Sequence, residues 1–93
     1  MAVGVTYVVL EREGIKMMIN GKSYRVKRSA GERYVEMSVD DLRSGMRLDQ
    51  GTYVSREETE HRGQINPLTW LIRLEGGTAY VESRSAQRVR VWI

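Results

Sequence analysis

The chain has 93 residues and a formal net charge of +3, with 41% hydrophobic and 29% charged residues. This length fits one domain over residues 1–93, and the composition excludes a disordered polymer. Cysteine is absent, which excludes disulfides, thiolate metal sites and thiol catalysis. No apolar run reaches the length of a membrane span, so we expect a cytoplasmic protein. Scarce Asn with frequent Arg and Glu favours a thermophilic source.

Alternating apolar residues mark the first part of the chain as β-structure. Residues 3–9 and 15–19 each show a period of two, which predicts two strands. Asn20-Gly21 is the pair best suited to the positive φ angles of a two-residue type I′ hairpin turn. The return strand "KSYRVKR" is followed by the turn "SAGE" and a further strand, "RYVEM".

The segment 38–48 interrupts this pattern. Ser38 or Asp40 can cap a single helical turn near residues 40–45, and Gly45 can end it. The surrounding stretch "YVEMSVDDLRSGMRL" resembles the strand–dLkxGd–strand segment of hedgehog/intein-type domains, and more loosely the glycine-containing elbow of double-psi barrels. The resemblance implies a β-barrel with a crossing elbow. It implies no self-splicing, because Met46 replaces the acidic residue after the glycine and the chain has no cysteine nucleophile.

The second part of the chain resumes the strand pattern after "GTYVSR". Residues 56–67 are the longest polar stretch and predict an exposed loop. "LTWLIRL", "TAYVES" and "RVRVWI" then predict three strands, with a turn at Gly76-Gly77 and another at "RSAQ".

Two segments of the chain correspond without a gap at an offset of 56 residues. Residues 15–37 lie over residues 71–93, so that both hairpin turns and both "RSA" turns fall in register. We therefore expect an internal repeat of two three-strand meanders. Seven or eight short antiparallel strands with regular turns predict an all-β fold, a small closed or partly open barrel. Closure would remove exposed strand edges and bring the last strand near the first.

Catalytic and metal-binding signatures are weak throughout. His61 is the single histidine and lies among Glu57, Glu58 and Glu60, where a solvated loop explains it better than a metal or acid–base site. The phosphate-binding glycine motifs are missing as well. We expect no catalytic residues, no cofactor, no metal and no enzymatic activity; a small hydrolase built on His61 is the remote alternative.

Basic residues gather in two stretches, residues 22–34 and residues 84–93, whereas the acidic residues lie elsewhere. Alternation in the last strand places two arginines and a tryptophan on one face, with Tyr34 and Tyr53 as further aromatic candidates. Cations that follow phosphates and aromatic planes that stack on bases are typical of small barrels that bind nucleic acid. The predicted nucleic-acid-binding residues are Arg25, Lys27, Arg28, Arg88, Arg90 and Trp92.

Two functions therefore stand at this stage. The first is a non-enzymatic module that binds DNA or RNA with low base specificity. The second is a protein–protein module, a phage, viral or regulatory docking protein or a homodimer, because Arg and Trp are favoured in interaction hot spots. Salt-dependent retention on nucleic acid separates the two.

Overall fold

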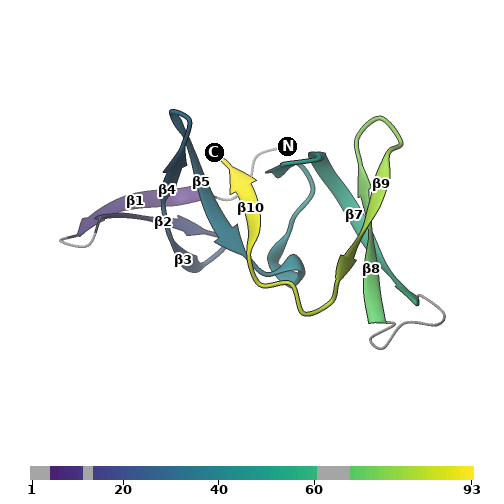
Figure 1. Ribbon diagram of the computed structural model, residues 1–93. Helices are drawn as coiled ribbons and strands as arrows, with labels where there is room; N and C mark the ends of the chain where they lie inside the picture. Colours follow the sequence, from purple (N-terminus) through teal and green to yellow (C-terminus); the bar gives the residue numbers. More distant parts are fainter. Residues whose placement is uncertain (1–4, 12–13, 61–67) are drawn as a thin grey trace.

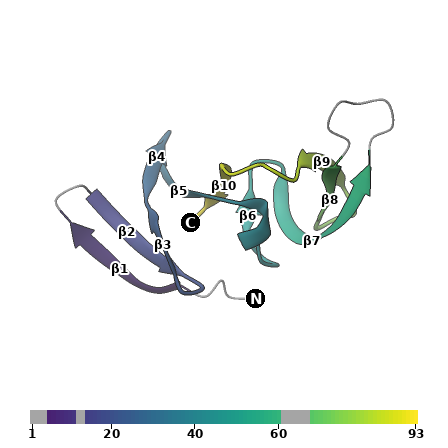
Figure 2. The ribbon, with the colours of Figure 1, turned by 90° about the horizontal axis from the view of Figure 1, so that it is seen from below.

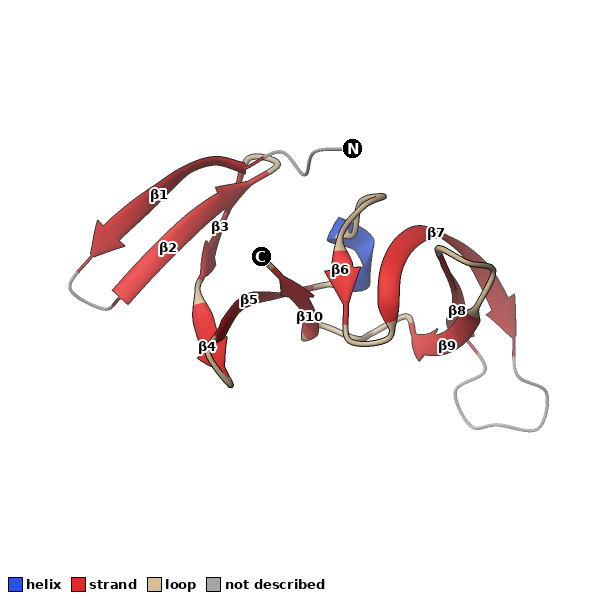
Figure 3. Ribbon diagram, turned by 90° about the horizontal axis from the view of Figure 1, so that it is seen from above, coloured by secondary structure: helices blue, strands red, loops and turns tan. Residues whose placement is uncertain are grey.

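A computed structural model describes residues 5–11, 14–60 and 68–93, and the described chain is all-β (Figure 1, Figure 3). It contains ten strands and a single 3-10 turn, η1 (Val39–Asp41). Among these residues no helix has the length and apolarity needed to cross a membrane. The strands are β1 (Val5–Glu11), β2 (Gly14–Ile19), β3 (Lys22–Arg25), β4 (Lys27–Ser29), β5 (Glu32–Met37), β6 (Arg47–Leu48), β7 (Gly51–Glu60), β8 (Leu68–Leu74), β9 (Ala79–Ser83) and β10 (Val89–Trp92).

The strands form two antiparallel sheets. The smaller has the order β1-β2-β3, and the larger has the order β4-β5-β10-β6-β7-β8-β9. Strands β1–β3 and β7–β9 lie at opposite ends of the molecule, with β5, β10 and β6 between them (Figure 2). The Cα radius of gyration is 14.4 Å, against about 12 Å for a compact domain of this length. The molecule is therefore elongated.

The sequence predicts a closed or partly open barrel, and the described strands form no closed barrel. The larger sheet ends in β4 on one side and β9 on the other, and the smaller ends in β1 and β3. The last strand also pairs differently from the expectation, because β10 lies between β5 and β6 rather than beside β1 or β9. What the structure supports is the coarser prediction of an all-β fold built from antiparallel sheets.

The predicted hairpin turns form where residues tolerate positive φ. Asn20 and Gly21 have φ of 50° and 83°, which fits the type I′ turn between β2 and β3. Ala30 and Gly31 have φ of 51° and 81° and join β4 to β5 in the same way. The stretch expected as one return strand divides at Val26 into β3 and β4, although the Val26 backbone N–H still donates to Ile15 O at 2.9 Å in the register of the β2–β3 ladder.

The helical turn begins slightly earlier than expected. Ser38 caps η1, because its hydroxyl accepts from the Asp40 backbone N–H at 3.3 Å. Leu42 follows the turn and is buried. Residues 56–60, expected in the polar loop, instead form the second half of β7, because they pair with β8 residue by residue up to Glu60. Residues 61–67, the rest of that loop, lie outside the described residues.

Strands β5 and β10 pair through residues that the 56-residue offset relates. Val35 lies opposite Val91, its own counterpart at the offset of 56 residues. Glu36 pairs with Arg90 and Tyr34 pairs with Trp92, and the offset converts the first of these pairs into the second. The two corresponding strands are therefore antiparallel neighbours at the centre of the larger sheet. Their three-strand meanders are not equivalent, since β9 pairs with β8 and not with β10. The internal repeat itself stays a prediction.

The core lies against the inner face of the larger sheet and η1, and among its buried residues the smaller sheet contributes Ile19. Alternation in β5, β8 and β10 directs one side chain in two inward, and both members of the central valine rung are buried. The alternation of "RVRVWI" predicts that Val89, Val91 and Ile93 face the core, but Ile93 is 43% exposed because it follows the last strand. The buried residues are Ile19, Val35, Met37, Val39, Leu42, Met46, Leu48, Tyr53, Ile72, Leu74 and Val91.

Candidate functional site

The face of β5 and β10 that points away from the core carries aromatic and charged side chains. Successive rungs place Lys27 of β4, Tyr34 of β5, Trp92 of β10 and Arg47 of β6 in one row across the sheet. The next rung on this face pairs Glu36 with Arg90. We call this surface the aromatic face; its residues are Lys27, Tyr34, Glu36, Arg47, Arg90 and Trp92.

Asp49 holds two of these side chains in place. It lies in the turn between β6 and β7, and its Oδ2 accepts from Arg90 Nε at 3.0 Å and lies 2.8 Å from Arg90 Nη2. Its other oxygen, Oδ1, accepts from Trp92 Nε1 at 2.7 Å. One carboxylate therefore orients both the guanidinium and the indole.

The guanidinium so placed contacts two aromatic rings. Arg90 Cζ lies 5.5 Å from the centre of the Trp92 ring and 5.7 Å from that of Tyr34. The two rings are themselves 5.0 Å apart with an interplanar angle of 49°. Each cation–π contact at a partly exposed site contributes about 0.5–1 kcal/mol. The side chains of Arg90, Trp92 and Tyr34 are thus held in place by contacts within the chain itself.

Carboxylates neutralise much of the positive charge on the aromatic face. Lys27 Nζ donates to Glu36 Oε1, and Arg47 Nη2 donates to Glu32 Oε1 at 2.9 Å. The hydrogen bond from Lys27, together with the positive charges of Arg88 and Arg90, lowers the pKa of Glu36. Each of the three cations of the face therefore contacts a carboxylate, and the charges of these pairs balance.

The structure brings together only some of the six predicted residues. Lys27, Arg90 and Trp92 share the aromatic face, and Arg88 is exposed next to β10. Arg28 lies on the opposite side of β4, because strand residues alternate. Arg25 belongs to the smaller sheet, where it pairs with Lys16. Of the two extra aromatic candidates, Tyr34 joins the face and Tyr53 is buried in the core.

Sequence reasoning missed Asp49 and Glu36, which bind the predicted cations. Both are separated in sequence from their partners by many residues, Arg90 being 41 residues from Asp49. The alternation of Arg88, Arg90 and Trp92 predicted the face but carried no signal for the strand beside it. A pairing register for β6 would have been needed to place Asp49 next to β10.

A second cluster of arginines and tryptophan occurs on β8. Trp70 lies between Arg56 and Arg84, whose Cζ atoms are 5.3 Å and 5.2 Å from the ring centre. Arg56 also donates to Tyr53 Oη at 3.0 Å and to the Asp40 backbone oxygen at 3.1 Å. The Trp70 Nε1 atom is buried and has no hydrogen-bond partner among the described residues. The hydrogen bond to Asp40 ties β7 to η1, and the contact with Trp70 ties β7 to β8, so the cluster has a structural role.

The described residues contain no cluster of metal ligands, and the comparisons with known proteins assign no family. No group of three or more His, Cys, Asp or Glu side chains able to hold a metal occurs within residues 5–11, 14–60 and 68–93. His61, the centre of the remote hydrolase alternative, lies outside these residues. Comparison of the chain with known protein families, with curated proteins and with solved structures finds no match.

Proposed function

We propose that the chain is a non-enzymatic protein-binding module that docks on its partner through the aromatic face. The observation that carries this proposal is the fixed cluster around Arg90, with Asp49 orienting both Arg90 and Trp92. Arg, Trp and Tyr are the residues that most often dominate the free energy of protein–protein binding. Because the cluster is already ordered, little side-chain entropy is lost on association.

Charge balance favours a protein partner over nucleic acid on this face. Nucleic-acid affinity depends mainly on cations that are available to neutralise phosphates. Here three of the cations, Lys27, Arg47 and Arg90, already contact carboxylates. A phosphate would have to displace Glu36, Glu32 or Asp49, whereas a protein surface with both charges can pair with them as they stand.

Photo-cross-linking tests this proposal directly. A benzoylphenylalanine introduced at position 88, beside the cluster, is expected to form one discrete protein adduct in cells of the native host. The variant Trp92→Ala should abolish this adduct, and the same cross-linker at Glu57, on β7 away from the face, should give none. Equal adducts from positions 88 and 57, or nucleic acid as the cross-linked species, would contradict the proposal.

Nucleic-acid binding remains the second candidate, on a different surface. Arg28 and Arg33 lie directly opposite each other in the β4–β5 hairpin and are exposed. Like charges placed opposite each other destabilise a hairpin, and a bound polyanion would relieve that repulsion. On this hypothesis, retention on DNA or RNA at low salt is lost in Arg28→Gln/Arg33→Gln and unaffected by Trp92→Ala.

A further inference from the structure

The larger sheet is interrupted beside β10. On the side away from β5, the neighbour of β10 is β6, and the two share the single rung Trp92 with Arg47. Strand β6 ends at Leu48 because the chain turns there into β7. Beyond that turn the facing strand is β9, and β9 pairs only with β8 in the described sheet.

The interruption leaves backbone groups of β10 without a strand partner. Ile93 N–H donates to Arg33 O at 3.0 Å, and hydrogen bonds in an antiparallel ladder alternate in direction. Val91 and Val89 therefore bond toward β5, whereas the N–H and C=O of Arg90 point into the interruption. No turn or loop backbone group of the described chain bonds to them. Such an edge is a template for an added strand.

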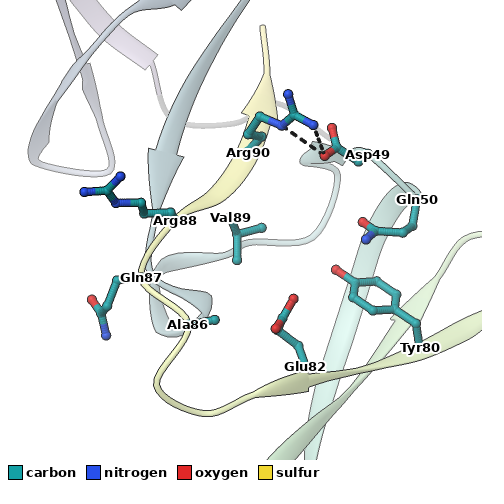
Figure 4. Close-up of a pocket in the computed structure, with 9 residues that line it drawn as sticks. All are labelled: Asp49, Gln50, Tyr80, Glu82, Ala86, Gln87, Arg88, Val89 and Arg90. Atoms are coloured by element: carbon teal, nitrogen blue, oxygen red, sulfur yellow. Dashed lines mark hydrogen bonds and ion pairs between the residues drawn. The ribbon is translucent and has the colours of Figure 1, made fainter.

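A cavity of about 310 Å³ occupies this position, which is within the range of ligand-binding sites. It lies between β10 and β9, below the Asp49-Gln50 turn (Figure 4). The side chains of Gln50, Tyr80 and Glu82 project into it, whereas the Arg88 side chain points away. We call this space the β9–β10 groove.

The β9–β10 groove is lined by two carboxylates, Asp49 and Glu82, and by two arginines, Arg88 and Arg90. The Asp49 carboxylate accepts a hydrogen bond from Arg90. Within the described structure the Glu82 carboxylate accepts only from the neighbouring Ser83 N–H, at 3.1 Å. Burial, with the negative charges of Glu82 and Asp49, raises the pKa of Tyr80 to about 12. Within the described structure, Glu82 is therefore the carboxylate that projects into the groove without an ion-pair partner, and a cation is favoured beside it.

On the side of β5 away from β10, the corresponding position holds a short added strand. β5 has the three-residue strand β4 beside it, and Lys27 of β4 lies opposite Tyr34. The 56-residue offset that relates the two central strands maps Tyr34 to Arg90. The place next to Arg90 that corresponds to β4 is empty, because the chain turns at Ser83 and Ser85, which bond each other at 2.9 Å.

We propose that the β9–β10 groove binds an extended segment of a partner protein, which adds as a strand beside β10 and places a Lys or Arg side chain on Glu82. This inference rests on the proposed function, of which it specifies the form and charge of the partner segment. Strand addition of this kind derives affinity from main-chain hydrogen bonds and specificity from alternate side chains.

A synthetic peptide with the sequence of residues 25–29, RVKRS with blocked termini, is the probe. In ¹⁵N-labelled protein at about 1 mM peptide, a concentration suited to weak binding, we expect saturable shifts at Arg90, Glu82 and Tyr80. The Arg90 amide should exchange with solvent faster than those of Val89 and Val91 in the free protein, and about tenfold more slowly with peptide bound. Shifts elsewhere only, or an Arg90 amide already protected without peptide, would overturn the inference.

Two charge reversals make the test specific. Glu82→Lys should abolish the peptide shifts, whereas Glu75→Lys, the same change at an exposed turn outside the groove, should leave them unaltered. Equal binding by both variants would refute the assignment of Glu82. Because Arg88 also lines the groove, Trp92→Ala separates the two proposals. A cross-link from position 88 that survives Trp92→Ala, with intact peptide shifts, would refute the aromatic face alone. Absent peptide shifts with a cross-link that depends on Trp92 would refute the groove alone.

Discussion

Strands β5 and β10 occupy related places at the centre of the larger sheet, yet their outer sides differ. β5 has β4 along its outer edge, and a hairpin turn of Ala30 and Gly31 holds that strand in place. On its side away from β5, β10 pairs with β6 over one rung only, and the rest of that edge faces the β9–β10 groove. The comparison shows that the same sequence, "RSA", can stand between two paired strands, as in residues 28–30, or between two strands that do not pair, as in residues 84–86. The pairing depends on which other strand of the chain lies beside each one.

The central rung should be the most sensitive point shared by both strands. Val35→Ala and Val91→Ala each remove buried methyl groups and leave a cavity, so each should lower the free energy of unfolding by about 2 kcal/mol. Urea denaturation of the two variants measures this. If β10 were a loosely attached strand, Val91→Ala would cost far less than Val35→Ala, and the shared central role would be wrong.

The hydrogen bonds from Arg90 and Trp92 to Asp49 should contribute less to the free energy of unfolding. Asp49→Asn weakens the bonds to Arg90 and Trp92 and should cost about 1 kcal/mol, since the pair is partly exposed to solvent. The Trp92 fluorescence should change with it. As a control, Glu57→Gln breaks the exposed pair with Arg73 and should cost less. An Asp49→Asn variant as stable as the wild type, with an unchanged spectrum, would show that Asp49 does not order the cluster.

The β5 side offers a stabilising change instead. Arg28→Glu converts a repulsive cross-strand pair with Arg33 into an attractive one and should raise stability by about 0.5 kcal/mol. The gain should shrink in high salt, as thermal unfolding in 0.05 M and 1 M NaCl will measure. A destabilised variant at low salt would mean that the two arginines do not face each other.

The smallest expected effect is a pH dependence from the groove. Folding raises the pKa of Tyr80 to about 12 from an ordinary value of 10.0. Its contribution to stability is therefore full below pH 10 and is lost as the pH rises toward 12. Unfolding free energies measured at pH 9 and 11 should fall less in Tyr80→Phe than in the wild type. Titration of tyrosinate absorbance should show one tyrosine near pH 12, lost in the same variant.

Local features of the fold were predictable from the sequence because they depend on neighbouring residues. The Asn20-Gly21 turn, the Ser38 cap and the inward positions of Val35 and Ile72 all follow from spacing and residue type. The order of strands was not predictable, because the pairing of β10 with β5 joins residues more than 50 positions apart. Barrel closure was inferred from the avoidance of exposed edges, but the described sheets end in the edge strands β1, β3, β4 and β9.

The candidate site was predictable to the same extent. Alternation placed Arg90 and Trp92 on one face, and this is confirmed by their contacts with each other and with Tyr34. The pairing of cations with Glu36 and Asp49 required the tertiary register. The length of β7 was underestimated because its second half is polar on both faces, so its pairing with β8, not hydrophobic alternation, defines it.

The two tryptophans make the molecule a source of two separate optical signals. Trp92 donates its indole N–H to a carboxylate, whereas the N–H of Trp70 is buried and has no acceptor in the part of the chain that the structure describes. Their emission should therefore differ in wavelength, with Trp70 the bluer. Variants that keep one indole at a time, Trp70→Phe and Trp92→Phe, would let the central strands and the β7–β9 end be followed independently during unfolding or binding.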